Sequence, residues 1–310
     1  IDHTEPGMVD LRDTAGWQLG VTVEVTGPVD AATATGTARK LKSMAQMRGL
    51  VDSVDTKAGT FQLLGDTISV DDETVWADLV DLSALTAGAQ VQVWALPVAS
   101  GALRATRVET QGIAATTTLA TGLISGLDPV GKTFRLGALV VDYTLVSALP
   151  ADALADGRIV RVEGAQAVAG GPLQATAVEG WYALSAVKDA RVQLEGVITD
   201  FASKSSFKLM GVTVDGSPAQ VTGGQENNLN NNVKVVAIGT LSDSGVLVAT
   251  SIKIRHVPGG GALTTYYDLH GTIQNFVSPS DMRVRGLSDA QPSVQQVDVS
   301  AALANSAVSG

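Results

Sequence analysis

One pattern of about 70 residues returns four times along the sequence, and this period constrains the fold more than any other feature. An opening glycine recurs at intervals of 73, 74 and 75 residues. A large apolar residue, an aspartate that ends a Val-Asp pair, and an alanine recur in the same cyclic order. The four landmark series are Gly49, Gly122, Gly196 and Gly271; Phe61, Phe134, Phe207 and Met282; Asp71, Asp142, Asp215 and Asp298; and Ala38, Ala105, Ala175 and Ala249. Because such a period is typical of repeat proteins, we expect a linear array of small domains rather than one large core.

Each unit is predicted to be a small all-β barrel. In the complete copy at residues 48–109, Val, Thr, Leu and Ile alternate with polar residues between turns that contain Gly and Asp. This alternation is typical of short antiparallel strands. Three strands precede a connection in which Asp81 is expected to start a single helical turn, and two more strands follow it. This order predicts a five-stranded OB-like barrel, whose closure removes exposed sheet edges.

The landmarks divide the chain into three complete units and a half barrel at each end. The complete units are residues 47–112, 118–180 and 190–255. Residues 1–46 lack the opening glycine and the apolar strand, so they are interpreted as the C-terminal half of a unit. Residues 267–310 stop before the last two strands and are interpreted as an N-terminal half. In the third complete unit an asparagine replaces the usual glycine, which is consistent with a left-handed backbone position.

The two halves are complementary, because each has the strands that the other lacks. An isolated piece of two or three strands buries too little apolar surface to be stable. We therefore expect the last residues of one molecule to complete the barrel begun by the first residues of the next, which gives a head-to-tail filament. The competing interpretation is that the sequence was cut within its first and last repeats. The predicted subunit interface comprises Gly20, Val21, Val23, Val25, Ala38, Leu41, Gly271, Ile273, Phe276, Met282, Val284 and Val297.

Composition narrows the choice of partners. The net charge is −10 and the predicted pI is 4.7, and an acidic surface repels phosphate backbones, so nucleic acid is not expected as a partner. The chain contains no cysteine, and no apolar run is long enough to span a bilayer. The sequence begins at Ile1 rather than at a methionine, which we interpret as a processed or truncated terminus that fits export.

Catalytic and cofactor chemistry have no visible basis in the sequence, and no enzyme activity or cofactor is expected. The three histidines occupy different positions of the repeat without neighbours at metal-ligand spacing, and there is no Gly-x-Ser-x-Gly motif. The repeated aspartates could bind calcium, but a strand-end aspartate that accepts a turn amide is the favoured interpretation. The repeated phenylalanines could stack on bases or sugars, but the methionine in the fourth copy favours a core position.

The order of motifs resembles the bacterial repeat family known as domain of unknown function 5666. The resemblance rests on Gly59–Leu63, Val141-Asp142, Val192–Phe201 and Gly245–Thr250, and it extends over essentially the whole chain. It implies an OB-like fold and an exported, extracellular or cell-surface protein, and it supplies no catalytic residues. The function expected from the sequence is a structural subunit of an extracellular filament. The alternative is a monomeric envelope-associated module that binds a glycan or a peptide.

Overall fold

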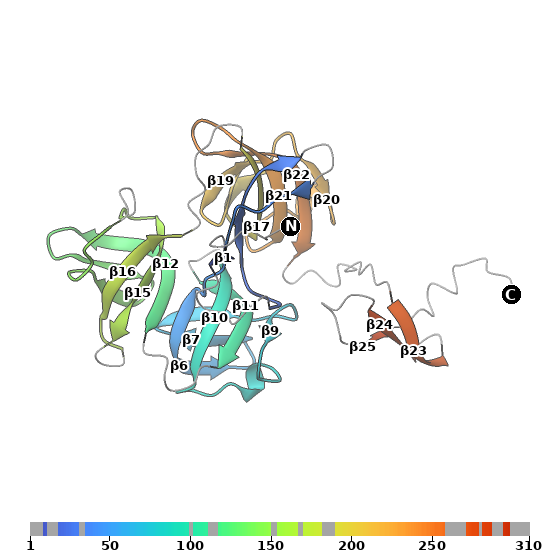
Figure 1. Ribbon diagram of the computed structural model, residues 1–310, viewed down its shortest axis with the longest axis horizontal. Coiled ribbons are helices and arrows are strands. Elements are labelled where there is room, and N and C mark those ends of the chain that lie inside the picture. Colours follow the sequence, from blue (N-terminus) through green and yellow to red (C-terminus); the bar gives the residue numbers. More distant parts are fainter. Residues whose placement is uncertain are drawn as a thin grey trace. The chain divides into compact units, whose positions relative to one another are not determined.

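The computed structural model describes residues 9–10, 18–30, 35–98, 102–110, 117–149, 154–166, 170–181, 190–257, 271–278, 281–286 and 294–297. The chain divides into two compact units, residues 1–263 and residues 264–310 (Figure 1). Strands dominate both units, and the helical elements among the described residues are two 3₁₀ turns, η1 (Leu82–Ala84) and η3 (Glu226–Asn228). Within this part of the chain no helix is long and apolar enough to cross a membrane. The all-β class predicted from the sequence is confirmed.

Residues 47–110 form a closed five-stranded barrel. Its strands are β6 (Met47–Asp55), β7 (Thr60–Leu63), β8 (Asp66–Ser69), β10 (Gln90–Pro97) and β11 (Leu103–Thr110). β6, β7 and β8 form an antiparallel meander, β8 pairs with β11 in parallel, and β11 pairs with β10 in the antiparallel sense. Pairing of β10 with β6 then closes the ring. The short strand β9 (Val75–Trp76) adds to β11 outside this ring.

Residues 118–180 form a second closed barrel with the same strand order. Its strands are β12 (Thr118–Asp128), β13 (Thr133–Leu136), β14 (Leu139–Asp142), β15 (Ile159–Gln166) and β16 (Leu173–Gly180). β14 pairs with β16 in parallel, and β12 pairs with β15 to close the ring. Figure 1 shows β12, β15 and β16 side by side in green. One pair of residues, Leu119 on β12 and Arg48 on β6, joins the two barrels into an 11-stranded sheet.

Residues 191–256 form a six-stranded sheet that repeats these pairings. Its strands are β17 (Arg191–Ser203), β18 (Ser206–Leu209), β19 (Val212–Asp215), β20 (Gln220–Thr222), β21 (Lys234–Leu241) and β22 (Leu247–His256). β19 pairs with β22 in parallel, as β8 does with β11, and β17 pairs with β21, as β6 does with β10. β20 adds to β22 as β9 adds to β11. The sheet therefore follows the connectivity of the two preceding barrels.

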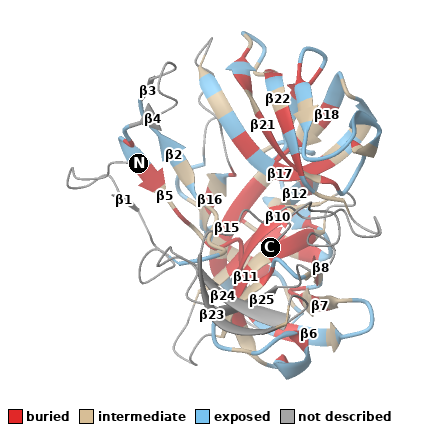
Figure 2. Cartoon of the chain, turned by 90° about the vertical axis from the view of Figure 1, so that its right-hand side faces the viewer, coloured by how far each residue is buried: buried red, intermediate tan, exposed pale blue. Residues whose placement is uncertain are grey.

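The repeated phenylalanines are core residues, as the sequence predicts. Phe61, Phe134 and Phe207 are each 1% exposed. Alternating burial appears in Figure 2 along β22, where buried residues in red alternate with less buried ones in tan and pale blue. A stacking platform for bases or sugars is therefore not available on these three side chains. The side chain of Met282 lies outside the described part.

The opening glycine is required by the hairpin that follows it. A Cβ added at Gly49 would lie 2.9 Å from the side chain of Leu64, and one at Gly196 would lie 3.0 Å from Met210. Leu64 and Met210 occupy the turn between the second and third strands with positive φ angles of 57° and 51°. The turn side chain thus folds back onto the first strand, where only a glycine leaves room for it. The prediction of a left-handed asparagine is also confirmed, because Asn232 has φ of 70°.

Strand pairing corrects the alignment of one landmark. Phe134 lies opposite Val141 and Phe207 lies opposite Val214, so Asp142 and Asp215 are equivalent. In the first barrel Phe61 lies opposite Ile68, and the equivalent of these aspartates is therefore Ser69. Asp71 lies two residues further along the chain. The sequence alignment placed it two residues out, because the first unit has Ile68-Ser69 at the paired position and its Val-Asp pair, Val70-Asp71, follows directly; only the strand register reveals this shift.

The strand-end aspartates accept turn amides. The carboxylate of Asp142 accepts the backbone N–H of Thr144 at 2.9 Å, and that of Asp215 accepts the N–H of Ser217 at 2.9 Å. The backbone and side chain of Thr144 lower the pKa of Asp142, and the side chain and backbone of Ser217 lower the pKa of Asp215. Asp71 makes the same bond to the N–H of Glu73 at 3.0 Å. Among the described residues, no three acidic or histidine side chains gather closely enough to hold a metal ion. Asp298 lies outside the described residues.

The third sheet contacts both barrels, which differs from the linear array predicted from the sequence. Lys234 Nζ on β21 lies 2.8 Å from Glu73 Oε2 in the first barrel. Ile159 at the start of β15 packs against the apolar cluster of residues 191–256, as do Leu96 and Trp181. Period and pattern specify each unit separately, but these contacts depend on side chains at the ends of the barrels, which do not repeat.

Candidate functional site

The described parts of residues 1–46 contain five short strands, three of which pair in the order that the last strands of the barrels follow. The strands are β1 (Val9–Asp10), β2 (Glu24–Thr26), β3 (Val29–Asp30), β4 (Thr35–Gly36) and β5 (Lys40–Lys42). β1, β5 and β2 form a three-stranded sheet in that order. β5 pairs with β1 in parallel and with β2 in the antiparallel sense, which repeats the order β9-β11-β10 and the order β20-β22-β21. We call β1, β5 and β2 the open sheet.

The register of the open sheet matches that of the complete units residue by residue. Val25 lies opposite Leu41, as Val93 lies opposite Val108 in the first barrel. Gly20 has φ of +82°, and the equivalent Gly88 also has φ of +82°. A Cβ at Gly27 would lie 1.9 Å from the carbonyl oxygen of Thr37. Gly164 and Gly239 make the same close approach, at 2.2 Å and 2.0 Å, to the residue before the landmark alanine of their own units. Sequence comparison found the first glycine but missed this second one.

The open sheet has an apolar strand that faces solvent. Val23 is 44% exposed and Val25 is 40% exposed, whereas their equivalents Val91 and Val93 are each 0% exposed. Figure 2 shows the same contrast, with β10 largely red and β2 tan and pale blue. In the barrels this surface is covered by the meander of the first three strands. The corresponding surface at Val23 and Val25 is exposed.

Other predicted interface residues are already packed inside the chain. Ala38 and Leu41 on the partner strand are each 5% exposed. Val21 packs against a small cluster formed by Ala45, Trp94 and Leu119. The open surface is therefore narrower than the sequence predicts, and it runs along Val23 and Val25.

The segment before β2 lacks the strand structure that its equivalents have. In the first barrel, Gln90–Val93 pair with β6 from the first half of the unit. Among the described residues, no strand pairs with residues 22–25 in the way that β6 pairs with Gln90–Val93, and the strand begins only at Glu24, where pairing with β5 starts.

Strands β23 (Gly271–Ser278), β24 (Asp281–Gly286) and β25 (Val294–Val297) form a meander that resembles the first three strands of the first barrel. They pair as an antiparallel three-stranded sheet. Ile273 lies opposite Val284 and Phe276 opposite Met282, as Val51 lies opposite Leu63 and Val54 opposite Phe61. A register shift falls at the same place in both first strands, after Ile273 and after Val51. Val297 lies opposite Met282 as Ile68 lies opposite Phe61.

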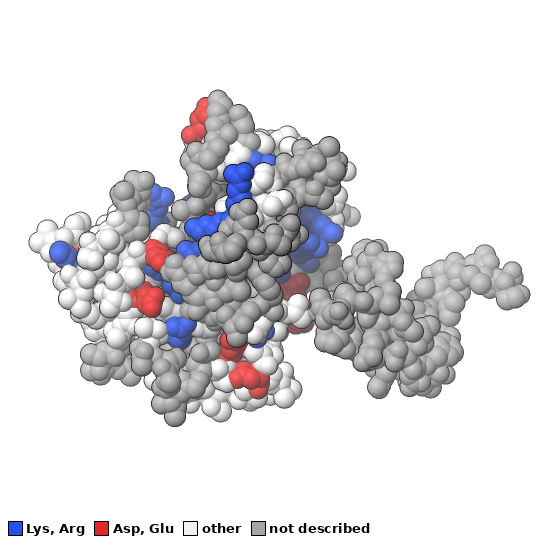
Figure 3. Space-filling model, viewed as in Figure 1, with Lys and Arg blue, Asp and Glu red and all other residues white. Residues whose placement is uncertain are grey.

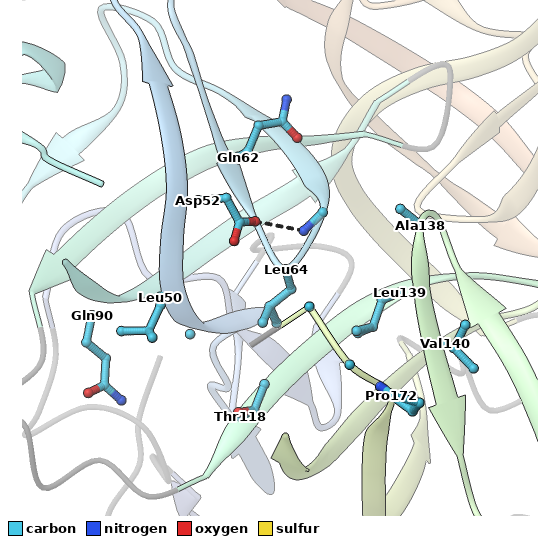
Figure 4. A pocket seen from close by; sticks show the side chains of 14 residues that line it. Leu50, Asp52, Gln62, Leu64, Gln90, Thr118, Ala138, Leu139, Val140 and Pro172 are labelled. Carbon is cyan, nitrogen blue, oxygen red and sulfur yellow. Dashed lines mark hydrogen bonds between the residues drawn. The ribbon is translucent and has the colours of Figure 1, made fainter. Parts of the chain in front are cut away.

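A separate groove lies between the first and second barrels. It has a volume of about 660 Å³ and is bordered by residues of β6, β7 and β14, by the first residues of β10 and β12, and by the segment 170–172 that precedes β16. In Figure 4, Asp52, Gln62, Gln90 and Thr118 contribute polar groups, and the Asp52 carboxylate accepts the backbone N–H of Gly65 at 2.9 Å. The lining contains no aromatic side chain and no histidine. The groove offers hydrogen-bonding groups, but no nucleophile and base in contact.

Charged side chains of both signs lie on the described surface. On the face shown in Figure 3, basic and acidic side chains lie interspersed. Several cations are paired, including Arg104 with Asp71 and Lys204 with Glu226. His256 lies at the end of β22, and His3 and His270 lie outside the described residues.

Asp66 is a half-buried carboxylate at the contact between the first two barrels. It sits at the hairpin after β7 and faces Gly137 and Ala138 of the second barrel, where a Cβ at Gly137 would lie 1.9 Å from Asp66 Oδ1. Burial raises the pKa of Asp66 to about 6, although the backbone N–H of Ala138 donates to it and opposes that shift. Because the folded-state pKa lies above the unfolded-state value, protonation favours the folded protein. This stabilisation is complete below about pH 4 and is lost as the pH rises through about 6.

Asp66→Asn is therefore expected to stabilise the protein at high pH and not at low pH. We expect a gain of about 1–2 kcal/mol in the free energy of unfolding near pH 8, after allowance for solvent screening, and no gain near pH 4. Urea unfolding at the two pH values measures it. Asp72→Asn, in an exposed turn, is the matched control. A gain that is the same at both pH values would contradict the assignment.

The comparisons identify the family of two repeats. The model of the family described as "Domain of unknown function (DUF5666)" matches residues 48–109 and 195–253. These ranges coincide with the first barrel and with most of the six-stranded sheet, so the family predicted from the sequence is confirmed there. Residues 118–180 share the strand order without being matched. A search of curated proteins matched none of them to this chain.

Proposed function

We propose that this chain, whose residues 48–109 and 195–253 belong to the DUF5666 family, is a non-enzymatic structural subunit of an extracellular filament. In this proposal the chain is organised as half, whole, whole, whole and half, and the last half of one subunit completes the first half of the next. The observation that carries the proposal is the open sheet, where Val23 and Val25 are 44% and 40% exposed while their equivalents are fully buried. Location at the cell surface is part of the same proposal.

The register of the complete barrels specifies how the halves would meet. Gly49 on the first strand lies opposite Val91 on the fourth, and Leu50 lies opposite Gln90. The equivalent pairs across two subunits are Gly271 with Val23 and Thr272 with Thr22. Ile68 on the third strand lies opposite Leu103 on the fifth, so Val297 would lie opposite Gly36. The occupant of the open sheet is thus β23–β25 of a second copy.

Joining the halves removes two unfavourable features at once. Burial of the remaining exposed surface of Val23 and Val25 contributes about 1 kcal/mol each. Pairing of β23 with the segment at Thr22 and Val23 satisfies main-chain groups that an edge leaves open. Because the two contacting surfaces lie on different parts of the chain, the contact is head-to-tail and extends into a filament unless its rotation closes a ring.

A monomeric binding module is the second candidate, and the groove between the first two barrels favours it. A groove of about 660 Å³ with Asp52, Gln62, Gln90 and Thr118 on its border could hydrogen-bond a glycan or a peptide. This function needs no assembly. Saturable binding in a glycan or peptide screen, together with a monomer at all concentrations, would support it over the filament.

The filament is tested by a disulfide at the proposed joint. The chain contains no cysteine, so Thr22→Cys combined with Thr272→Cys introduces the only two thiols. Directly opposite residues on paired strands bring their Cα atoms within about 4.5–5.5 Å, which suits a disulfide. We expect a ladder of covalent oligomers on a non-reducing gel, and filaments with four barrels per subunit in negative-stain images.

The matched control is Thr22→Cys with Ser278→Cys, which places the second thiol at the far end of β23. We expect much less cross-linking from this off-register pair. A protein that stays monomeric, with no disulfide in either variant, would contradict the proposal. A disulfide formed only within single chains would contradict it too, because it would show that the chain closes its own split barrel.

A further inference from the structure

We propose that Arg107, Thr106 and Arg161 hold the open sheet in one fixed orientation relative to the first two barrels. The open sheet is connected to the rest of the chain by two crossings, residues 18–22 before β2 and residues 43–47 after β5. Both crossings are bound by side chains of the barrels, and the two arginines among them are buried and have no arginine at the equivalent positions of the other units. The consequence for filament stiffness rests on the proposed function, but the fixed orientation itself does not.

The first crossing is bound by β11 of the first barrel. Arg107 Nη1 donates to the carbonyl oxygen of Leu19 at 2.9 Å, and its Nη2 donates to the side-chain oxygen of Gln18. Thr106 Oγ1 donates to the carbonyl oxygen of Gly20 at 2.6 Å. The Arg107 side chain is only 7% exposed and is also paired with Glu109. A planar guanidinium held at several points orients the chain that it binds.

The second crossing is bound by the second barrel. Arg161 Nε donates to the carbonyl oxygen of Ala45 at 3.0 Å, and its side chain is 2% exposed. Thr121 Oγ1 donates to the carbonyl oxygen of Gln46 at 2.8 Å. Each of these bonds satisfies a buried backbone carbonyl in a segment that has few sheet partners of its own.

Gln46 connects the two crossings to each other and to the first barrel. It is 0% exposed, and its side-chain amide donates to Met44 O at 2.7 Å and to Thr22 Oγ1 at 3.2 Å. Its side-chain oxygen accepts the backbone N–H of Ala95. Its own N–H donates to Val93 O at 2.8 Å. Through Gln46, both crossings are therefore tied to β10 of the first barrel.

Comparison across the repeat shows that these contacts are specific to the first two barrels. Thr176 and Thr250, the equivalents of Thr106, bond to carbonyls of their own units, at Glu163 and Ile238. The position of Arg107 is occupied by Ala177 and Ser251 in the other units. The position of Arg161 is occupied by Gln92 and Val236. The arginines thus occur only in the barrels that touch the crossings, among the three units compared.

Gly20 shows how close this contact is. A Cβ at Gly20 would lie 2.5 Å from the carbonyl oxygen of Thr106 and 2.9 Å from Arg107 Cβ. The segment that leads into the open sheet therefore packs directly against β11, and we infer that it is not a flexible linker. In a filament, a fixed orientation of the open sheet would fix the orientation of the next subunit and make the fibre stiff.

Spin labels on the full chain test the fixed orientation without requiring filaments. Arg39→Cys on the exposed side of the open sheet and Lys57→Cys in an exposed turn of the first barrel provide two labelling sites. In dilute protein we expect a narrow distribution of label–label distances. With Arg107→Ala and Thr106→Val added, we expect the distribution to broaden about two-fold or more. Arg107→Lys, which keeps the charge and loses the fork of donors, should give an intermediate width.

Thr176→Val is the matched control, because it removes the same hydroxyl from the second barrel and should leave the width unchanged. A double variant that remains as narrow as the parent would overturn the inference, and so would a parent that is already broad. In negative-stain images we expect the double variant to form filaments whose persistence length falls about two-fold or more. If the parent forms no filaments, the proposed function fails while the spin-label result still decides the fixed orientation.

Discussion

Filament formation is expected to be lost when Val23 and Val25 are replaced by aspartate. Both side chains lie on the exposed surface that the proposal covers with a meander, and both have fully buried equivalents in the first barrel. Completion of the barrel would then bury two carboxylates without partners, at a cost of several kcal/mol. We expect the concentration needed for assembly to rise more than about 100-fold, since about 1.4 kcal/mol corresponds to a factor of ten.

Sedimentation of the polymer and negative-stain images measure this loss, and thermal unfolding shows whether the barrels remain folded. Val80→Asp with Val130→Asp is the matched control, because these valines are 88% and 94% exposed and lie away from the open sheet. The control should assemble as the parent does. If the variant with aspartate at Val23 and Val25 assembles normally, the open sheet is not part of the contact between subunits.

A large loss of stability is expected from a single methyl group at Gly239. A Cβ there would lie 2.0 Å from the carbonyl oxygen of Val248 and 2.7 Å from the Cα of Ala249. Both are backbone atoms of the paired strand, so no side chain can rotate away, and β21 and β22 must separate at a point where their register already shifts. We expect Gly239→Ala to lower the free energy of unfolding by about 3 kcal/mol.

Urea unfolding of the full chain measures the effect, and the first barrel supplies the reciprocal variant. Ala95 occupies the equivalent position of β10, also beside a register shift. Ala95→Gly should cost only about 1 kcal/mol, through chain entropy and a small loss of packing. A Gly239→Ala variant as stable as the parent would show that the close approach of the two strands is not needed.

Much of each repeat unit could be predicted from local pattern alone. Period-two alternation identifies strands because successive side chains point to opposite faces, and Phe61, Phe134 and Phe207 are buried as this predicts. The turn at Asp81 forms because its carboxylate accepts the N–H of Ser83 at 2.7 Å, a contact within the turn itself. Opening glycines and the left-handed Asn232 follow from equally local geometry. These features depend only on residues that are close in the sequence, so the sequence alone determined them.

Strand register and contacts between units were decided by the tertiary structure. Asp71 is displaced from Asp142 and Asp215, because register depends on which residues pair across a sheet and the first unit carries its Val-Asp pair two residues beyond the paired position. Burial of Ala38 and exposure of Val25 depend on what lies above each strand. Arg107, Arg161 and Asp66 interact with segments far away in sequence, at positions where the repeat is not obeyed. Contacts between distant segments leave no period in the chain, so only the folded structure brings them into view.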